Sequence, residues 1–182
     1  TGKTQVIAEA CLQLFRNNPS IKILVCSETH IAVNNILERV SKLNSEMKLL
    51  RIQDKEESSS IQNYTVDTVL KNYSLWIEDN VVNPEVSKIL MESFVESEDV
   101  KSVGKSLFLS ANLVGMTCNR VGAYSFNNSA EMFDVVIIDE VCKATLPEIL
   151  MPLSVCKKAV LVGDPKQLSP IFTTEERSII ES

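Results

Sequence analysis

Apolar positions along the chain follow two patterns that alternate with one another. Compact aliphatic runs predict strands at residues 21–27, 47–53, 111–118, 133–140 and 157–164. Several of these runs are unbroken rather than alternating with polar residues, which is typical of strands covered on both faces of a parallel sheet. Amphipathic stretches lie between the runs. This alternation of strand and helix favours an α/β fold with a mainly parallel sheet.

The amphipathic stretches predict helices because their apolar residues recur every three to four positions. Five such stripes begin at Val6, Val33, Val66, Val86 and Leu146. At the start of the last one, Thr145 and Glu148 have the spacing of a capping box.

Residues 54–105 interrupt this rhythm, because they hold at least two helical patterns and no convincing strand. Polar runs open and close the stretch, DKEESSS and ESEDVKSVGKS. We interpret it as a helical insertion into the sheet domain, with Tyr73 and Trp76 in its apolar core rather than as platforms for bases. The chain starts at Thr1 without an initiator Met, and its last ten residues have the pattern of an interrupted helix. We therefore expect one domain over residues 1–182, incomplete at both ends.

Composition narrows the class of protein only in part. Of 182 residues, 45% are hydrophobic and 23% are charged, which suits one domain with a core and a polar surface. No apolar run reaches the roughly 18 residues of a membrane-spanning helix, and no signal peptide is visible. The five cysteines form no C-x-x-C pair. We expect them to be small buried or half-buried thiols in a reducing, intracellular compartment, the cytoplasm or the nucleus.

The net charge of −6 argues against broad electrostatic binding of nucleic acid. Any such binding must use a local surface. Scattered surface charge is the simpler interpretation of the basic residues near strand ends and the insertion, and a nucleic-acid track is the alternative; these residues are Arg51, Lys55, Lys101, Lys105 and Arg120.

The first four residues read TGKT. They match the second half of the phosphate-binding pattern G-x-x-x-x-G-K-[ST], and the match begins at Thr1. In that pattern Gly2 lets the backbone approach phosphate, Lys3 binds the β- and γ-phosphates, and the Thr4 hydroxyl is a magnesium ligand. The amphipathic helix that follows would present its N-terminus to the anion. A helix start with a nearby lysine is common, so the tetrapeptide alone leaves both interpretations open.

Residues 135–140 read VVIIDE, a buried strand that ends in two carboxylates. Such a strand places Asp139 at the carboxyl edge of the sheet, where α/β folds bind ligands. Asp139 would hold magnesium through water, and Glu140 would polarise the attacking water as general base. The alternative is an acidic strand end that is merely solvated.

Residues 159–170 read AVLVGDPKQLSP, a strand that runs into a Gly-Asp-Pro turn. Gln167 follows where its amide would contact the γ-phosphate or the lytic water. Taken alone, the segment also fits an ordinary surface loop. The phosphate loop, the carboxylate pair and the glutamine occur in this order at strand and helix junctions, and together they favour a nucleotide hydrolase over a chance combination.

The series TGKT, CSETHIAVNNILERV, GMTC, VVIIDEVCKATLPEI and LVGDPKQLSP resembles superfamily 1 helicases of the up-frameshift-like branch, over nearly the whole chain. The resemblance implies a three-layer RecA-like P-loop NTPase sandwich, the first of two such domains, with a helical insertion after the second strand. ATP and Mg²⁺ would bind in the cleft between the two domains. The residues that match the hydrolysis motifs are Lys3, Thr4, Asp139, Glu140 and Gln167.

The resemblance also implies a site for single-stranded RNA or DNA. The segment 27–34 matches one that contacts the nucleic-acid backbone, and Thr117 matches a second contact. The contact residues predicted in the segment are Ser27, Thr29 and Asn34.

Two positions depart from the family pattern. The segment reads CSETH where sequences such as A-P-S-N are more usual, which puts Glu28 and His30 in or near the path of the nucleic acid. His30 fits a helix start or a surface position better than a nucleic-acid contact. Lys143 stands where the family often has Gln; it could bind a phosphate or an acidic neighbour, and a solvated lysine is the simpler interpretation.

The leading hypothesis is an ATP-dependent helicase or translocase. One alternative is a P-loop ATPase that works as a switch or assembly factor without unwinding. Another is a binding module with a vestigial nucleotide site, against which the presence of all four residues Lys3, Asp139, Glu140 and Gln167 argues. Because half of the phosphate loop and the second domain are not in the sequence, we expect these 182 residues alone to bind nucleotide weakly or not at all.

Overall fold

A computed structural model describes residues 2–53, 61–86, 88–89, 106–123 and 132–167. Within these ranges five strands form one sheet: β1 Ile23–Ser27, β2 Leu49–Arg51, β3 Leu113–Thr117, β4 Phe133–Ile138 and β5 Cys156–Leu161. Their order is β2-β3-β1-β4-β5, and every neighbouring pair is parallel. The parallel α/β sheet predicted from the aliphatic runs is confirmed, and each strand is shorter than its run.

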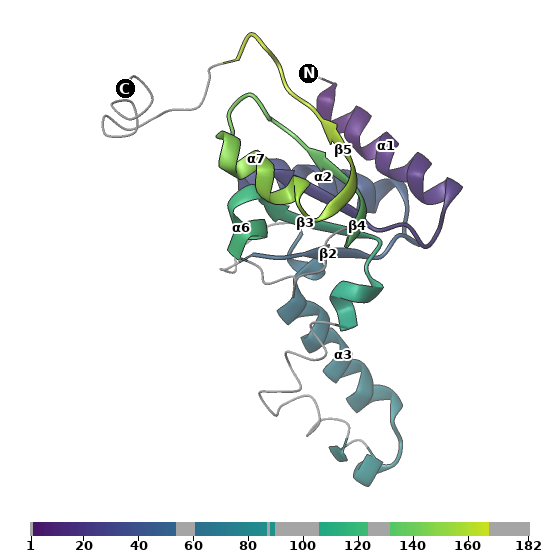
Figure 1. Cartoon of the computed structure of the whole chain (residues 1–182). Helices are drawn as coiled ribbons and strands as arrows, with labels where there is room; N and C mark the ends of the chain where they lie inside the picture. The colour runs from purple at the N-terminus through teal and green to yellow at the C-terminus, as the bar shows by residue number, and fades with distance from the viewer. Residues whose placement is uncertain (1, 54–60, 87, 90–105, 124–131, 168–182) are drawn as a thin grey trace.

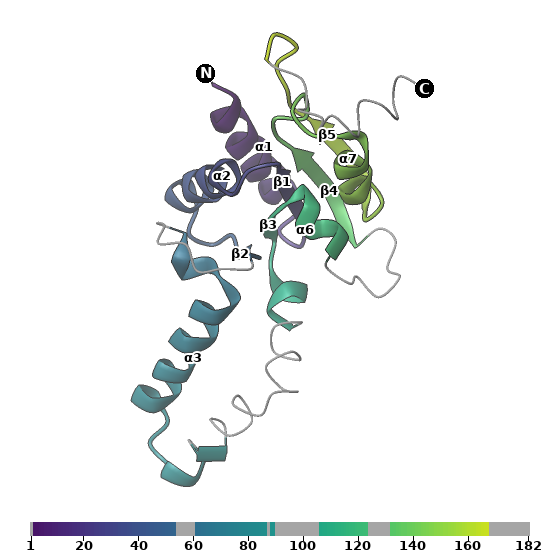
Figure 2. The ribbon, with the colours of Figure 1, turned by 90° about the vertical axis from the view of Figure 1, so that its left-hand side faces the viewer.

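Helices cover both faces of this sheet (Figures 1 and 2). α1 Lys3–Asn17 and α2 His30–Leu43 lie on one face, and α6 Cys118–Ala123 and α7 Leu146–Leu153 lie on the other. In β1, Ile23 and Val25 join the core beneath α1 and α2, whereas Leu24 and Cys26 join the core on the opposite face. Because both faces are buried, the strand needs apolar residues at successive positions.

Threonine side chains define where three of the helices begin. The Thr29 hydroxyl accepts from the Ala32 N–H at the start of α2, at 3.3 Å. Thr65 has the same role for α3 Val66–Asn80. At α7, the backbone N–H of Thr145 donates to the Glu148 carboxylate at 2.7 Å, which confirms the predicted capping box.

The helix α3 extends away from the sheet (Figure 1). Of its apolar stripe, Ile77 is buried, whereas the side chains of Tyr73 and Trp76 are not described. Residues 84–86 and 88–89 are helical, and Val86 and Ile89 are exposed there. Residues 54–60, 87 and 90–105 lie outside the described residues, so the insertion over 54–105 stays a prediction.

The five cysteines are small buried or half-buried thiols, as expected from the sequence. Cys11, Cys26 and Cys118 are buried, Cys142 and Cys156 are half-buried, and all five thiols are free. In the part of the chain that the structure describes, no helix has the length and apolar character needed to cross a membrane.

Candidate functional site

The carboxyl ends of the parallel strands bring the predicted site residues to one edge of the sheet. Ser27 and Thr117 end β1 and β3, and the register pairs these two residues directly. Asp139 follows β4 immediately. Val162, just after β5, donates its N–H to the Ile138 carbonyl at 2.8 Å, so the segments that follow β4 and β5 leave the sheet side by side. This edge is where open α/β sheets bind ligands.

The N-terminus of α1 supplies the residues of the phosphate-binding pattern. Gly2 is the N-cap, its carbonyl accepts from Val6 N–H at 3.0 Å, and no acidic residue lies in the first turn. The Lys3 Nζ is buried from solvent and has no hydrogen-bond partner among the described residues. A buried ammonium without acceptors is unfavourable, so this environment suits a bound anion. Thr4 follows in the same turn, and Thr1 lies outside the described residues.

Asp139 is buried, with 5% of its surface exposed. Its N–H donates to the Cys26 carbonyl at 2.8 Å, and its own Oδ1 accepts from the Glu140 N–H at 2.8 Å. Burial raises the pKa of Asp139, while the Glu140 N–H and the positive charge of Lys3 act in the opposite direction. Since the charge of Lys3 reaches Asp139, the two residues belong to one electrostatic environment. A carboxylate in such a place fits a divalent cation, which would favour its charged form.

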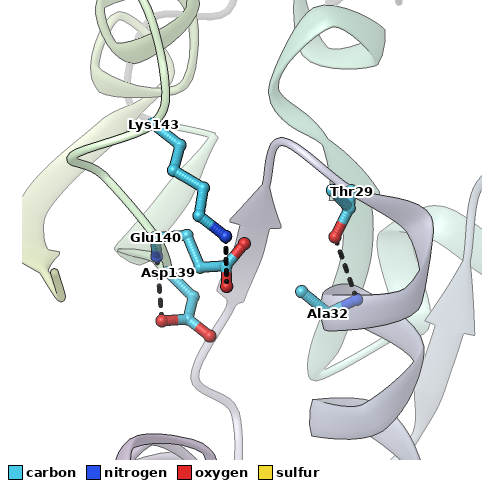
Figure 3. A network of polar contacts seen from close by, with 5 residues as sticks. All are labelled: Thr29, Ala32, Asp139, Glu140 and Lys143. Carbon is cyan, nitrogen blue, oxygen red and sulfur yellow. Dashed lines mark hydrogen bonds and ion pairs between the residues drawn. The ribbon is translucent and has the colours of Figure 1, made fainter. Parts of the chain in front are cut away.

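Glu140 adopts the left-handed backbone conformation, with φ of 56°. Its carbonyl accepts from the Lys143 N–H at 2.8 Å, and its Oε1 lies 3.1 Å from the Lys143 Nζ. Figure 3 shows this pair together with Thr29 at the start of α2. The interpretation of Lys143 as a partner of an acidic neighbour is therefore confirmed, and the side chain is also 39% exposed, so it stays partly solvated.

The segment after β5 packs against the turn that follows Glu140. Val141 donates its N–H to the Val162 carbonyl at 3.1 Å. A Cβ at Gly163 would lie 2.7 Å from the Cys142 Sγ and 2.8 Å from Val141 Cγ1, so the close approach requires glycine. Beyond the turn, the Gln167 Oε1 is buried and has no partner among the described residues. Like the Lys3 Nζ, this atom is suited to a bound group that supplies the missing hydrogen bond.

The residues predicted to contact nucleic acid lie at the same edge, but three of the four are buried. Ser27 and Thr117 are buried strand ends, and the Ser27 Oγ has no partner within the described residues. Thr29 caps α2. The Asn34 Oδ1 accepts from the Nε of Arg51 at 2.7 Å, inside the domain. Contact of these residues with nucleic acid stays a prediction.

The position of Arg51 in the structure shows that both interpretations based on the sequence are wrong. The side chain is 1% exposed, so it is neither scattered surface charge nor part of an exposed track. Both interpretations considered only the residue type. The position of Arg51 inside the aliphatic run LLRIQ was the feature of the sequence that indicated burial. His30 is confirmed as a helix start, since it is the first residue of α2. Arg120 is half-buried in α6, and Lys55, Lys101 and Lys105 lie outside the described residues.

A parallel sheet between helical layers, with a lysine-bearing helix N-terminus and a carboxylate pair at its carboxyl edge, defines a P-loop nucleotide-binding domain of RecA-like fold. A family model described as the AAA domain matches residues 1–88 and 79–175, and the chain belongs to this family.

Curated relatives agree with the resemblance to superfamily 1 helicases. The chain is 28% identical to the DNA polymerase alpha-associated DNA helicase A of Saccharomyces cerevisiae, over 97% of this chain and 30% of that protein. It is 29% identical to the ATP-dependent helicase upf1 of Schizosaccharomyces pombe, over 97% and 20%. It is 30% identical to the DNA replication ATP-dependent helicase/nuclease DNA2 of Bos taurus, over 97% and 14%. The chain therefore spans less than a third of the length of each of these relatives.

Proposed function

We propose that this chain is the first RecA-like motor domain of an ATP-dependent nucleic-acid helicase or translocase. The observation that carries the proposal is the buried Lys3 Nζ, which has no partner among the described residues and lies at a helix N-terminus in the electrostatic environment of Asp139. A structural lysine would end on a carboxylate or in water. An ammonium placed in this way is available to bind the phosphates of a nucleotide.

In this proposal the chain's own groups divide the work of ATP hydrolysis. Lys3, Gly2 and the N–H groups at the start of α1 bind the phosphates. Thr1, outside the described residues, stays a predicted contact. Thr4 and Asp139 hold Mg²⁺, which when bound neutralises charge on the phosphate oxygens. Glu140 accepts the proton of the attacking water, and Lys143 orients its carboxylate. The amide oxygen of Gln167, which has no partner within the described ranges, accepts a hydrogen bond from that water.

The nucleic-acid side of the proposal uses the neighbouring strand ends. The elements are the end of β1 with Ser27, the start of α2 with Thr29, and the end of β3 with Thr117. They adjoin the β4 end that carries Asp139, because β1 pairs with both β3 and β4. A conformational change at the phosphate site could therefore pass directly through neighbouring strands to the nucleic-acid contacts. We propose single-stranded RNA or DNA as the substrate, bound mainly through its backbone, and a second RecA-like domain as partner. The five free thiols support an intracellular location, in the cytoplasm or nucleus.

A second candidate is an ATPase that acts as a switch or assembly factor without unwinding. The net charge of −6 and the exposed Glu28 beside the proposed backbone contacts favour it. The two candidates differ in their response to nucleic acid. In the complete protein that carries this sequence, single-stranded oligonucleotides should stimulate ATP turnover by a factor of ten or more if it is a motor. Turnover that is unchanged by oligouridylate and by oligothymidylate would refute the motor and leave the switch.

A further inference from the structure

Arg51 is a charged side chain enclosed by the protein at the end of β2. Among the described residues its guanidinium has four hydrogen-bond acceptors, which come from α2, from β3 and from the residue that follows β2. Nε donates to the Asn34 Oδ1 at 2.7 Å, and Nη1 donates to the carbonyls of Ile52 at 2.5 Å and Gly115 at 3.1 Å. Nη2 lies 2.8 Å from the Nδ1 of His30.

The chemistry of this cluster fixes the state of the histidine. A guanidinium only donates, so the Nδ1 of His30 must be the acceptor and carry no hydrogen. The ring hydrogen of a neutral His30 is therefore on Nε2. The planar guanidinium of Arg51 also fixes the directions in which its acceptors can lie. A lysine ammonium is a single point charge and could not donate to the same four acceptors.

The acceptors belong to the elements that carry the proposed nucleic-acid contacts. His30 and Asn34 are one turn apart on α2, whose N-cap is Thr29. Gly115 is two residues before Thr117 on β3. A Cβ at Gly115 would lie 2.7 Å from Leu37 Cδ1, so β3 and α2 are also in close contact here. The Arg51 side chain thus forms hydrogen bonds to both α2 and β3. The spacing between these two elements defines the proposed interface.

The same residue joins this interface to α3. The backbone of Arg51 forms a parallel bridge with Thr65, which caps α3. The guanidinium itself is not at the surface, because Arg51 is 1% exposed. A direct contact with a nucleic-acid phosphate is excluded by this burial.

We propose that Arg51 is a positioning residue, which acts through His30, Asn34 and Gly115 to set the geometry of the nucleic-acid interface. This inference rests on the proposed function. It predicts that replacing Arg51 weakens the binding of single strands far more than the binding of ATP. The reason is that the guanidinium forms hydrogen bonds to α2 and β3 and not to the N-terminus of α1.

The test uses the complete protein that carries this sequence, with a short oligouridylate and a short oligothymidylate as probes. For Arg51→Lys, the concentration of single strand that gives half-maximal stimulation should rise about tenfold, as expected for misplaced contacts, whereas the KM for ATP should change much less. Lys48→Met is the matched control, since it removes an exposed positive charge at the other end of the same strand. It should leave both quantities unchanged.

A second pair of variants keeps the test valid if Arg51→Lys does not fold. His30→Ala removes one acceptor from the guanidinium at a half-exposed position, and His30→Gln restores an acceptor. We expect His30→Ala to raise the half-maximal concentration at least threefold and His30→Gln to recover most of the loss. Equal behaviour of His30→Ala and the wild type, or parallel changes in the KM for ATP and the half-maximal concentration, would overturn the positioning role.

Salt dependence separates positioning from direct contact. Loss of a residue that binds phosphate lowers the slope of log Kd against log salt concentration by about 1. For Arg51→Lys we expect weaker binding with an unchanged slope. A lowered slope in Arg51→Met would show that Arg51 binds phosphate itself and would overturn the inference. Failure of the proposed function appears differently, as a wild-type protein that neither binds nor responds to either oligonucleotide.

Discussion

The Nζ of Lys143 lies 3.1 Å from the Oε1 of Glu140, and both residues belong to a turn in which Glu140 has φ of 56°. A left-handed conformation costs a residue with a Cβ about 1–2 kcal/mol. The ion pair and the Lys143 N–H bond to the Glu140 carbonyl hold the turn in place. The side chain of Lys143 is 39% exposed and that of Glu140 21%, so the pair contributes at most about 1 kcal/mol to stability. Its effect is to orient the carboxylate.

Replacement of Glu140 by Gln should abolish turnover and leave ATP binding intact. The amide has the size of the carboxylate but cannot accept the proton of water, so kcat should fall by about a hundredfold or more. Steady-state ATPase assays of the complete protein would measure it, with Glu46→Gln, at an exposed position before β2, as control. Near-normal kcat in Glu140→Gln would remove this residue from the role of general base.

Replacement of Lys3 by Met should separate stability from function. The Lys3 Nζ is buried and has no partner in the part of the chain that the structure describes, so its loss should leave the free energy of unfolding unchanged or raise it by up to about 2 kcal/mol. In the complete protein that carries this sequence, saturating ATP with Mg²⁺ should stabilise the wild type, by about 2.7 kcal/mol at a hundred times Kd, and should not stabilise Lys3→Met. Thermal unfolding with and without nucleotide measures both effects. Lys166→Met, on an exposed turn, is the control, and a Lys3→Met protein that still responds to ATP would contradict the assigned site.

Asp134 gives a prediction about pH. The Lys157 ammonium, at 2.9 Å, and the Lys22 N–H, at 3.0 Å, lower the pKa of this carboxyl below 3.8. A lowered pKa stabilises the fold above the unfolded value, and this contribution is lost as the pH falls through the folded value. Asp134→Asn should therefore reduce the free energy of unfolding at pH 7 by less than about 1 kcal/mol, with discounting for solvent screening.

Urea denaturation at several pH values would test the Asp134 prediction. The difference between Asp134→Asn and the wild type should shrink below pH 3.8 and should also shrink in high salt, because the ion pair is partly exposed. A difference of the same size at low and neutral pH would mean that the loss comes from packing instead.

Replacement of Gly115 by Ala should destabilise the domain. The new Cβ would lie 2.7 Å from Leu37 Cδ1 and 2.8 Å from Val33 Cγ1, both in the core between β3 and α2. Overpacking of this kind costs about 1–3 kcal/mol. Chemical denaturation measures the loss, and a double-mutant cycle supplies the control. In a Leu37→Ala background the cost of Gly115→Ala should be smaller, and a cost that is equal in both backgrounds would contradict the predicted clash.

Reading the sequence found the strands, and it predicted candidate nucleotide-binding residues at their ends, because both signals are local. The six residues VVIIDE, for example, predict both that β4 is buried and that its polar end can bind a ligand. The same local reasoning failed for Arg51. It was treated as a charged residue, and charged residues are usually solvated. Its partners Asn34, His30 and Gly115 lie on other elements, which residue type does not reveal.

The amino-acid sequence by itself determined the α/β class, the parallel sheet and the candidate residues at its carboxyl edge, since these follow from periodicity and from strand ends. Only the tertiary structure decided which polar atoms are satisfied within the protein. It left the Lys3 Nζ and the Gln167 Oε1 without partners among the described residues, and it gave Arg51 four acceptors. The reason is that hydrogen bonding in a buried site depends on groups brought together from distant parts of the chain.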